Sequence, residues 1–225
     1  MSEWWTYTPS DFLLFSPRIY YRMFELYNRS LWPVAVLSLA LGFTILVLLL
    51  RPTSASHRII LAILGALWVW IAYAFFWERY AIINWASVYL APLFGLQGVA
   101  LTWAAVSGQI KFVPSRKIQD VVALALFGFS LIGYPLLAPL MGRQWSAAEI
   151  FGLAPDPTAL ATLALLCLAD GSRRWPLLIV PSMWCLITGL TLWTMDAGDF
   201  FIAPVGALSA LAIAFFRSRR RHQGA

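Results

Sequence analysis

Long runs of apolar residues dominate the chain and are separated by short polar segments. A helix needs about 20 mostly apolar residues to cross a bilayer, because each residue adds about 1.5 Å and the hydrocarbon core is about 30 Å thick. No charged residue falls inside a run, as expected if burying one at a helix centre costs about 2.5–3.5 kcal/mol. The runs predict seven transmembrane helices, at residues 31–50, 59–77, 87–106, 121–141, 157–169, 175–194 and 201–216.

The fifth run, 157–169, is the shortest and makes roughly 20 Å of helix. Asp156 followed by Pro157 is typical of a helix start, with Asp156 as the N-cap and proline in the first helical position. Two structures fit this pattern. Either residues 145–155 form a partly buried segment that leads into a short span, or the run re-enters the membrane without crossing it.

Basic residues segregate to one side of the membrane when all seven runs cross it. That side carries eleven Lys and Arg and two acidic residues, whereas the other carries five basic and eight acidic residues. The positive-inside rule places the first side in the cytoplasm, with the amino terminus outside and the carboxyl terminus inside. Dropping the fifth run would put Arg173 and Arg174 opposite Lys111 and Lys117, so the charges favour seven crossings.

The segment before the first run has the pattern of an amphipathic helix. Ser16-Pro17 has the chemistry of a helix start. A polar stripe then faces an apolar stripe, which is typical of a helix lying in the membrane interface. Glu25 and Arg29 have the spacing of an i,i+4 ion pair. The helix is either a surface anchor without a partner or a lid over an outward cavity. The polar stripe comprises Arg18, Arg22, Glu25 and Arg29, and the apolar stripe Tyr20, Met23, Phe24, Tyr27 and Leu31.

Composition supports an integral membrane protein of the all-α class. Of the 225 residues, 61% are hydrophobic and 12% charged, with a mean hydropathy of +0.75, whereas soluble domains have about 25% charged residues. The expected architecture is an outer-face interfacial segment (1–30), a seven-helix transmembrane domain (31–216) and a basic cytoplasmic tail (217–225). The basic residues sit at the ends of apolar runs, so the lipid bilayer is the expected partner and nucleic acid is not.

The reactive residues form no recognisable catalytic or metal motif. His57 and His222 lie in predicted cytoplasmic segments without a second ligand at useful spacing. Cys167 and Cys185 are expected to be small buried thiols. The last run lacks the lysine that retinal proteins need. We therefore expect no catalytic residue, no metal and no cofactor.

Uncharged polar residues inside the runs are the remaining candidates for a site. They either form interhelical hydrogen bonds or line a substrate site where prolines interrupt the spans. The predicted topology brings Asn28, Asn84, Tyr134 and the charged Asp156 to the outer membrane face, and Gln97, deeper in its run, could line the floor of a cavity beneath Asn84. A purely capping role for Asn28, Asn84 and Asp156 is the alternative. The substrate-binding candidates are Asn28, Asn84, Gln97, Tyr134 and Asp156.

Ordered short strings along nearly the whole chain resemble a known bacterial family. They are Phe24-Glu25-Leu26-Tyr27-Asn28 with Leu31-Trp32-Pro33, Ile83-Asn84 with Phe94-Gly95 and Gln97-Gly98, and Tyr134-Pro135 with Phe151-Gly152 and Pro155-Asp156-Pro157-Thr158. Together they resemble the membrane family called domain of unknown function 6064. In the family pattern a cysteine stands where this chain has Asp156, and a histidine where it has Phe76. The resemblance implies an inner-membrane protein without an established activity.

These features predict a permease-like, non-enzymatic protein for a small neutral or apolar solute in a bacterial inner membrane. The absence of acidic residues from the runs argues against proton coupling through a buried carboxylate. The alternative is an accessory subunit that packs on other membrane proteins, or on a second copy of itself, through small residues such as Gly189 and Gly206-Ala207.

Overall fold

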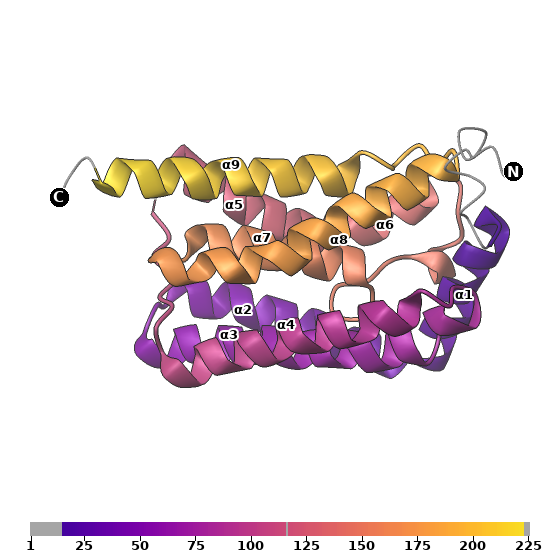
Figure 1. The fold of residues 1–225 in the computed structure, drawn as a ribbon, viewed down its shortest axis with the longest axis horizontal. Helices are drawn as coiled ribbons and strands as arrows, with labels where there is room; N and C mark the ends of the chain where they lie inside the picture. Colours follow the sequence, from indigo (N-terminus) through magenta and orange to yellow (C-terminus); the bar gives the residue numbers. More distant parts are fainter. Residues whose placement is uncertain (1–14, 116, 223–225) are drawn as a thin grey trace, which may run out of the picture.

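The computed structural model describes residues 15–115 and 117–222. Its long helices run side by side in two layers, with α2–α4 in the lower layer of Figure 1 and α5–α9 in the upper one. The helix α1 (Pro17–Ser30) lies at one end of the bundle. The other helices are α2 (Trp32–Leu50), α3 (Ser54–Trp70), α4 (Ser87–Ser107), α5 (Ile118–Gly128), α6 (Tyr134–Leu140), α7 (Pro155–Leu168), α8 (Trp175–Thr194) and α9 (Ile202–His222).

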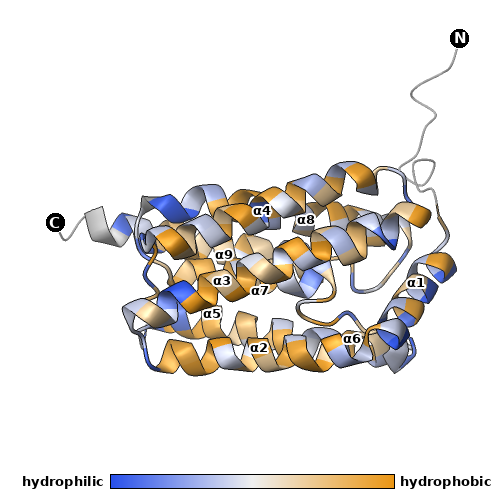
Figure 2. Cartoon of the chain, turned by 90° about the horizontal axis from the view of Figure 1, so that it is seen from below, coloured by the Kyte–Doolittle hydropathy of each residue, from blue (hydrophilic) through white to orange (hydrophobic). Residues whose placement is uncertain are grey.

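Six helical stretches in the described residues are long and apolar enough to span a membrane. Two of them are compound. The helix α3 continues through a π-helical turn (Ile71–Trp77) and a 3-10 turn (Tyr80–Ile82), and α5 continues through a π-helical turn (Phe129–Gly133) into α6. Apolar residues cover the length of the bundle and hydrophilic ones gather at its ends (Figure 2). This arrangement confirms a helical bundle of membrane type.

The amphipathic helix at the amino-terminal end forms as predicted. Ser16 caps it by accepting a hydrogen bond from the Ile19 N–H at 3.4 Å, and Pro17 occupies the first position. Its apolar stripe packs on the bundle, because Phe24 and Tyr27 both contact the ring of Phe75. The predicted Glu25–Arg29 ion pair is wrong. Glu25 pairs instead with Arg22, one turn earlier, at 2.5 Å.

The predicted fifth run forms α7, and every residue of this helix is buried. The neighbouring helices, and not lipid, cover the surface of α7, so the length of α7 need not match the thickness of a bilayer. It is preceded by an irregular segment, residues 148–154, which we call the buried loop. At one end Ser146 accepts a hydrogen bond from Asn28 of α1, and at the other Leu168 accepts one from Val113. The chain therefore passes from one end of the bundle to the other between these residues.

The start of α7 differs from the prediction. Asp156 is not the N-cap: the helix begins at Pro155, and the capping residue Ala154 makes no side-chain cap bond. Thr158 ties the turn together, since its hydroxyl accepts from the Gly152 N–H at 2.8 Å and donates to the Ala154 carbonyl at 2.7 Å. Asp156 lies in the first turn, and its carboxyl points to other helices.

Two further boundaries and contacts differ from expectation. The helix α9 does not end at Phe216 but continues to His222, into the predicted tail. The small residues expected to meet a partner are used inside the chain. A Cβ on Gly189 would lie 2.2 Å from Cγ of Pro204, and one on Gly206 would lie 2.5 Å from Cδ1 of Leu160. The predicted segment 1–30 is described only from residue 15 onward.

Candidate functional site

The carboxyl of Asp156 lies fully buried between α7, α6 and α8. Trp184 donates its indole N–H to Oδ1 at 2.7 Å, and the Thr188 hydroxyl donates to Oδ2 at 2.8 Å. These two side chains are four residues apart and so share one face of α8. Tyr134, the first residue of α6, donates its hydroxyl to Oδ2 at 3.2 Å. Three donors from two helices therefore converge on one carboxyl.

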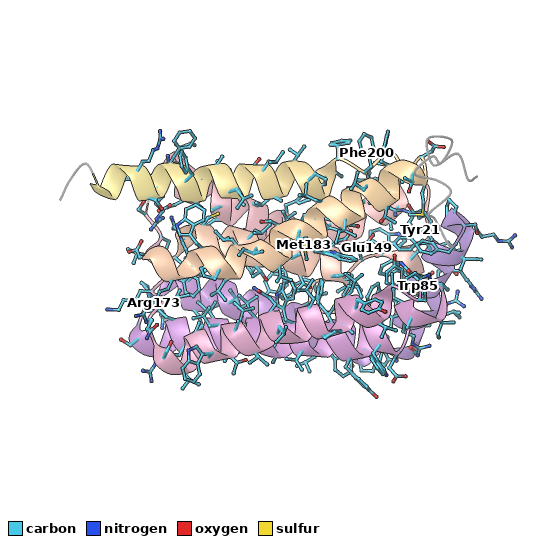
Figure 3. All side chains as sticks on the ribbon, viewed as in Figure 1. Tyr21, Trp85, Glu149, Arg173, Met183 and Phe200 are labelled. Carbon is cyan, nitrogen blue, oxygen red and sulfur yellow. The ribbon has the colours of Figure 1, made fainter. Side chains whose placement is uncertain are left out.

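A second carboxyl, that of Glu149, reaches Asp156 from the buried loop. Glu149 is 6% exposed and lies close enough to Asp156 for the two carboxyls to interact, and its Oε2 has no hydrogen-bond partner among the described residues. Glu149 lies between the two layers of helices, inward of Tyr21 (Figure 3). We call these residues the acid pair.

Aromatic rings form the wall beside the acid pair. The ring of Trp184 contacts Phe76 at 5.0 Å and Phe94 at 5.4 Å between centroids, both edge-on. Trp68 stacks on Phe94 at 4.4 Å and donates its indole N–H to Thr162 of α7 at 2.9 Å. These rings exclude water, and an apolar surrounding strengthens the hydrogen bonds that the carboxyls accept.

Polar contacts close the bundle at the α1 end. Arg143 forms an ion pair with Asp199, which joins the loop after α6 to the loop before α9. The Arg143 guanidinium also lies 4.5 Å from the ring centroid of Tyr21 in α1. Asn28 of α1 donates to the carbonyls of Ser146 and Ala148, at 2.8 and 2.7 Å, directly before Glu149. This layer separates the acid pair from the end of the bundle.

A second polar layer closes the opposite end. Arg217 of α9 forms ion pairs with Asp120 and, at 3.2 Å, with Asp170. Arg174 donates to the carbonyl of Ala214 at 2.7 Å and to the hydroxyl of Ser218 at 2.8 Å. The acid pair therefore lies in an apolar interior between two polar layers.

Comparison with known proteins shows the family. The sequence pattern of a family described as "Family of unknown function (DUF6064)" matches residues 17–225. The chain belongs to the DUF6064 family.

One curated relative is an apolipoprotein N-acyltransferase from Photobacterium profundum. It is 26% identical over 154 residues, which are 64% of this chain but 26% of that protein. The chain thus spans about a quarter of the relative's length. No solved structure matches the chain.

Part of the strings that resemble the DUF6064 pattern lies around Asp156. Tyr134 donates to its carboxyl, and the Gly152 N–H donates to the Thr158 hydroxyl in the turn that carries it. Two departures from the pattern, Asp156 and Phe76, are also close together, because Trp184 bonds the first and contacts the second. Both residues that differ from the family pattern, Asp156 in place of Cys and Phe76 in place of His, therefore contact the indole of Trp184.

The structure brings only part of the predicted site together. Tyr134 and Asp156 are in direct contact, and Asn28 binds the carbonyl of Ala148, next to Glu149. Asn84 instead accepts from the Ala86 N–H at 3.1 Å, within its own turn. Gln97 donates to the Leu177 carbonyl of α8 at 2.9 Å. That carbonyl lies four residues before Pro181, which has no N–H to offer it, so Gln97 satisfies a group that the proline leaves open.

Other members of the site were missed because their partners are distant in sequence. Glu149 lies outside the seven predicted runs, whereas Trp184 and Trp68 lie inside runs and are both buried and hydrogen-bonded to α7. Trp103, in contrast, is 71% exposed. The prediction that charged residues lie at the two membrane faces is wrong for Asp156, because its side chain lies inside the bundle. Both cysteines are buried and unbonded to each other, and the described residues contain no His, Cys, Asp or Glu group placed to hold a metal ion.

Proposed function

We propose that the protein is a permease-like carrier of a small neutral solute, with the acid pair as its binding and proton-exchanging centre. The observation that carries this proposal is that two neighbouring carboxyls, those of Glu149 and Asp156, lie buried inside an apolar bundle. Ionisable residues at such positions are expensive and commonly mark substrate or proton pathways. The pair also lies where an irregular segment meets a helix start, an arrangement that transporters use for binding.

The acid pair gives a physical basis for coupling solute binding to the binding of a proton. Two neighbouring carboxyls share one proton, since two adjacent negative charges in a buried site are unfavourable. The pair then carries one negative charge, which a second proton removes. The sequence argument against proton coupling assumed that no acid lies among the spans, and the position of Asp156 removes that assumption.

The two polar layers fit a carrier that is closed at both ends. The Arg143–Asp199 pair with α1 would open toward one side, and the contacts of Arg217 and Arg174 toward the other. In alternating access one layer opens while the other stays shut.

The proposal includes seven crossings of a bacterial inner membrane, with the amino terminus outside. The buried loop with α7 supplies the seventh passage, because protein surrounds it and its backbone need not face lipid. Reporter fusions after Ser54, Lys117, Arg174 and Ala225 should all give cytoplasmic signals. A periplasmic signal after Arg174 would contradict the count.

Liposomes containing the purified full chain test the carrier function. Osmotic re-swelling is measured with glycerol and urea as neutral probes, while an entrapped pH dye follows proton movement. We expect faster re-swelling for at least one probe and loss of this gain in Asp156→Asn. The matched control is Asp196→Asn, the same chemical change at an exposed residue. Equal rates for the wild type and Asp156→Asn with every probe would contradict the proposal.

A membrane enzyme of acyl transfer is a second candidate, supported by the likeness to the N-acyltransferase. Cys185 of α8 is the thiol that this reading offers as nucleophile, because it is free and buried on the helix whose Trp184 and Thr188 bind Asp156. Transfer of an acyl group from a phospholipid to a lipopeptide, abolished in Cys185→Ala, would favour this candidate. Re-swelling that is unchanged in Cys185→Ala would favour the carrier.

A further inference from the structure

A groove at the α1 end of the bundle is separate from the acid pair. It lies between α1 and the 3-10 turn Tyr80–Ile82 and encloses about 290 Å³. Its apolar lining includes Ile19 and Leu26 of α1, both 48% exposed, and Ile82, which is 76% exposed. Such exposure of large apolar side chains along a groove indicates a surface that an apolar ligand covers.

Three arginines line the same groove, namely Arg18, Arg22 and Arg79. Arg18 and Arg22 are one helical turn apart and therefore point to the same side of α1. Arg22 pairs with Glu25 at 2.5 Å, and Arg79 donates to the hydroxyl of Ser30 at 3.2 Å. Arg18 makes no ion pair with any residue that the structure describes. Glu25 balances the charge of one of the three arginines, so the groove keeps a net positive charge.

We expect the groove to lie near the level where a bilayer surface meets the protein. It adjoins the end of the apolar stretch Ser54–Ile82, which is long enough to span a membrane. Trp85, 64% exposed, follows a few residues later and lies at the same end of the bundle as α1 (Figure 3). Exposed tryptophan is typical of the headgroup region.

We propose that this groove binds an anionic phospholipid of the surrounding membrane. The phosphate lies among the three guanidiniums, whose planar donors match phosphate oxygens, and the first part of an acyl chain lies along Ile19, Leu26 and Ile82. Arginines near a membrane surface attract anionic lipid headgroups. The apolar lining selects a lipid over a free phosphate, which gains nothing from those side chains.

The test measures lipid binding to the detergent-solubilised full chain by native mass spectrometry. The probes are dioleoyl phosphatidylglycerol, dioleoyl phosphatidylcholine and glycerol 3-phosphate. We expect tighter binding of phosphatidylglycerol than of phosphatidylcholine and no competition by glycerol 3-phosphate. Each arginine near a membrane surface is worth about fivefold in affinity, so Arg18→Gln/Arg22→Gln/Arg79→Gln should weaken phosphatidylglycerol binding at least about tenfold.

Arg29→Gln is the matched control, since Arg29 lies on α1, is exposed and does not line the groove. It should change the affinity less than about twofold, while far-UV circular dichroism shows that all variants stay folded. Equal affinity for the two lipids, a triple variant that binds like the wild type, or an equal loss in Arg29→Gln would overturn the proposal. Full competition by glycerol 3-phosphate would assign the groove to a free anion instead.

Discussion

Replacing Asp156 by leucine tests whether its carboxyl holds α6, α7 and α8 together. The change removes the acceptor that Trp184, Thr188 and Tyr134 share at 2.7, 2.8 and 3.2 Å. A buried donor left without an acceptor costs about 1–3 kcal/mol, and the indole N–H cannot rotate toward another one. The hydroxyls of Thr188 and Tyr134, unlike the indole, can turn toward other acceptors, which offsets part of the loss. We therefore expect the free energy of unfolding to fall by about 3–5 kcal/mol.

Asparagine at this position separates hydrogen bonding from charge. Asp156→Asn keeps the volume and one acceptor oxygen, so the expected loss is about 1–2 kcal/mol. Unfolding by sodium dodecyl sulfate in mixed micelles, followed by circular dichroism, measures both variants, with Asp196→Asn as an exposed control. A leucine variant as stable as the wild type would refute the idea that the three donors depend on this carboxyl.

Two further changes test other parts of the fold. Gln97→Leu should lose about 1–3 kcal/mol of stability, because the Leu177 carbonyl loses its donor. Pro181→Ala should recover part of this loss by giving that carbonyl a helical N–H, and an additive double variant would contradict the pairing. Gly152→Ala should lose about 1–3 kcal/mol in the same unfolding assay, because φ is +79° and the new Cβ would lie 2.9 Å from a neighbouring side chain; a stable variant would disprove the tight turn.

The parts of the fold that depend on local pattern were predictable. The six long helices follow from the length of their apolar runs, and α1 from Ser16-Pro17 and the two stripes that follow. These signals lie within one helix, where spacing decides which residues share a face. The central position of α7 was not predictable in this way, because its complete burial depends on the neighbouring helices and not on its own sequence.

The members of the candidate site were predictable only where the sequence pattern itself singled out a polar residue. Tyr134 and Asp156 were chosen, but their contact joins residues 22 positions apart, and the bonds from Trp184 and Thr188 span 28 and 32 positions. Glu149 lies in a stretch that reads as a polar outer loop, and nothing local shows that the chain turns inward there. Pro181 removes one N–H from α8, yet only the packing of α4 on α8 identifies Gln97 as the partner of the Leu177 carbonyl.

Infrared spectroscopy tests the central claim, a buried acid pair that shares one proton, most directly. The carbonyl stretch of a protonated carboxyl is measured at pH 7 for the full chain in liposomes, with Glu149→Gln and Asp196→Asn recorded under the same conditions. The claim predicts a protonated-carboxyl band in the wild type and in Asp196→Asn that is absent from Glu149→Gln. A wild-type spectrum without this band, or a band that persists in Glu149→Gln, would contradict it.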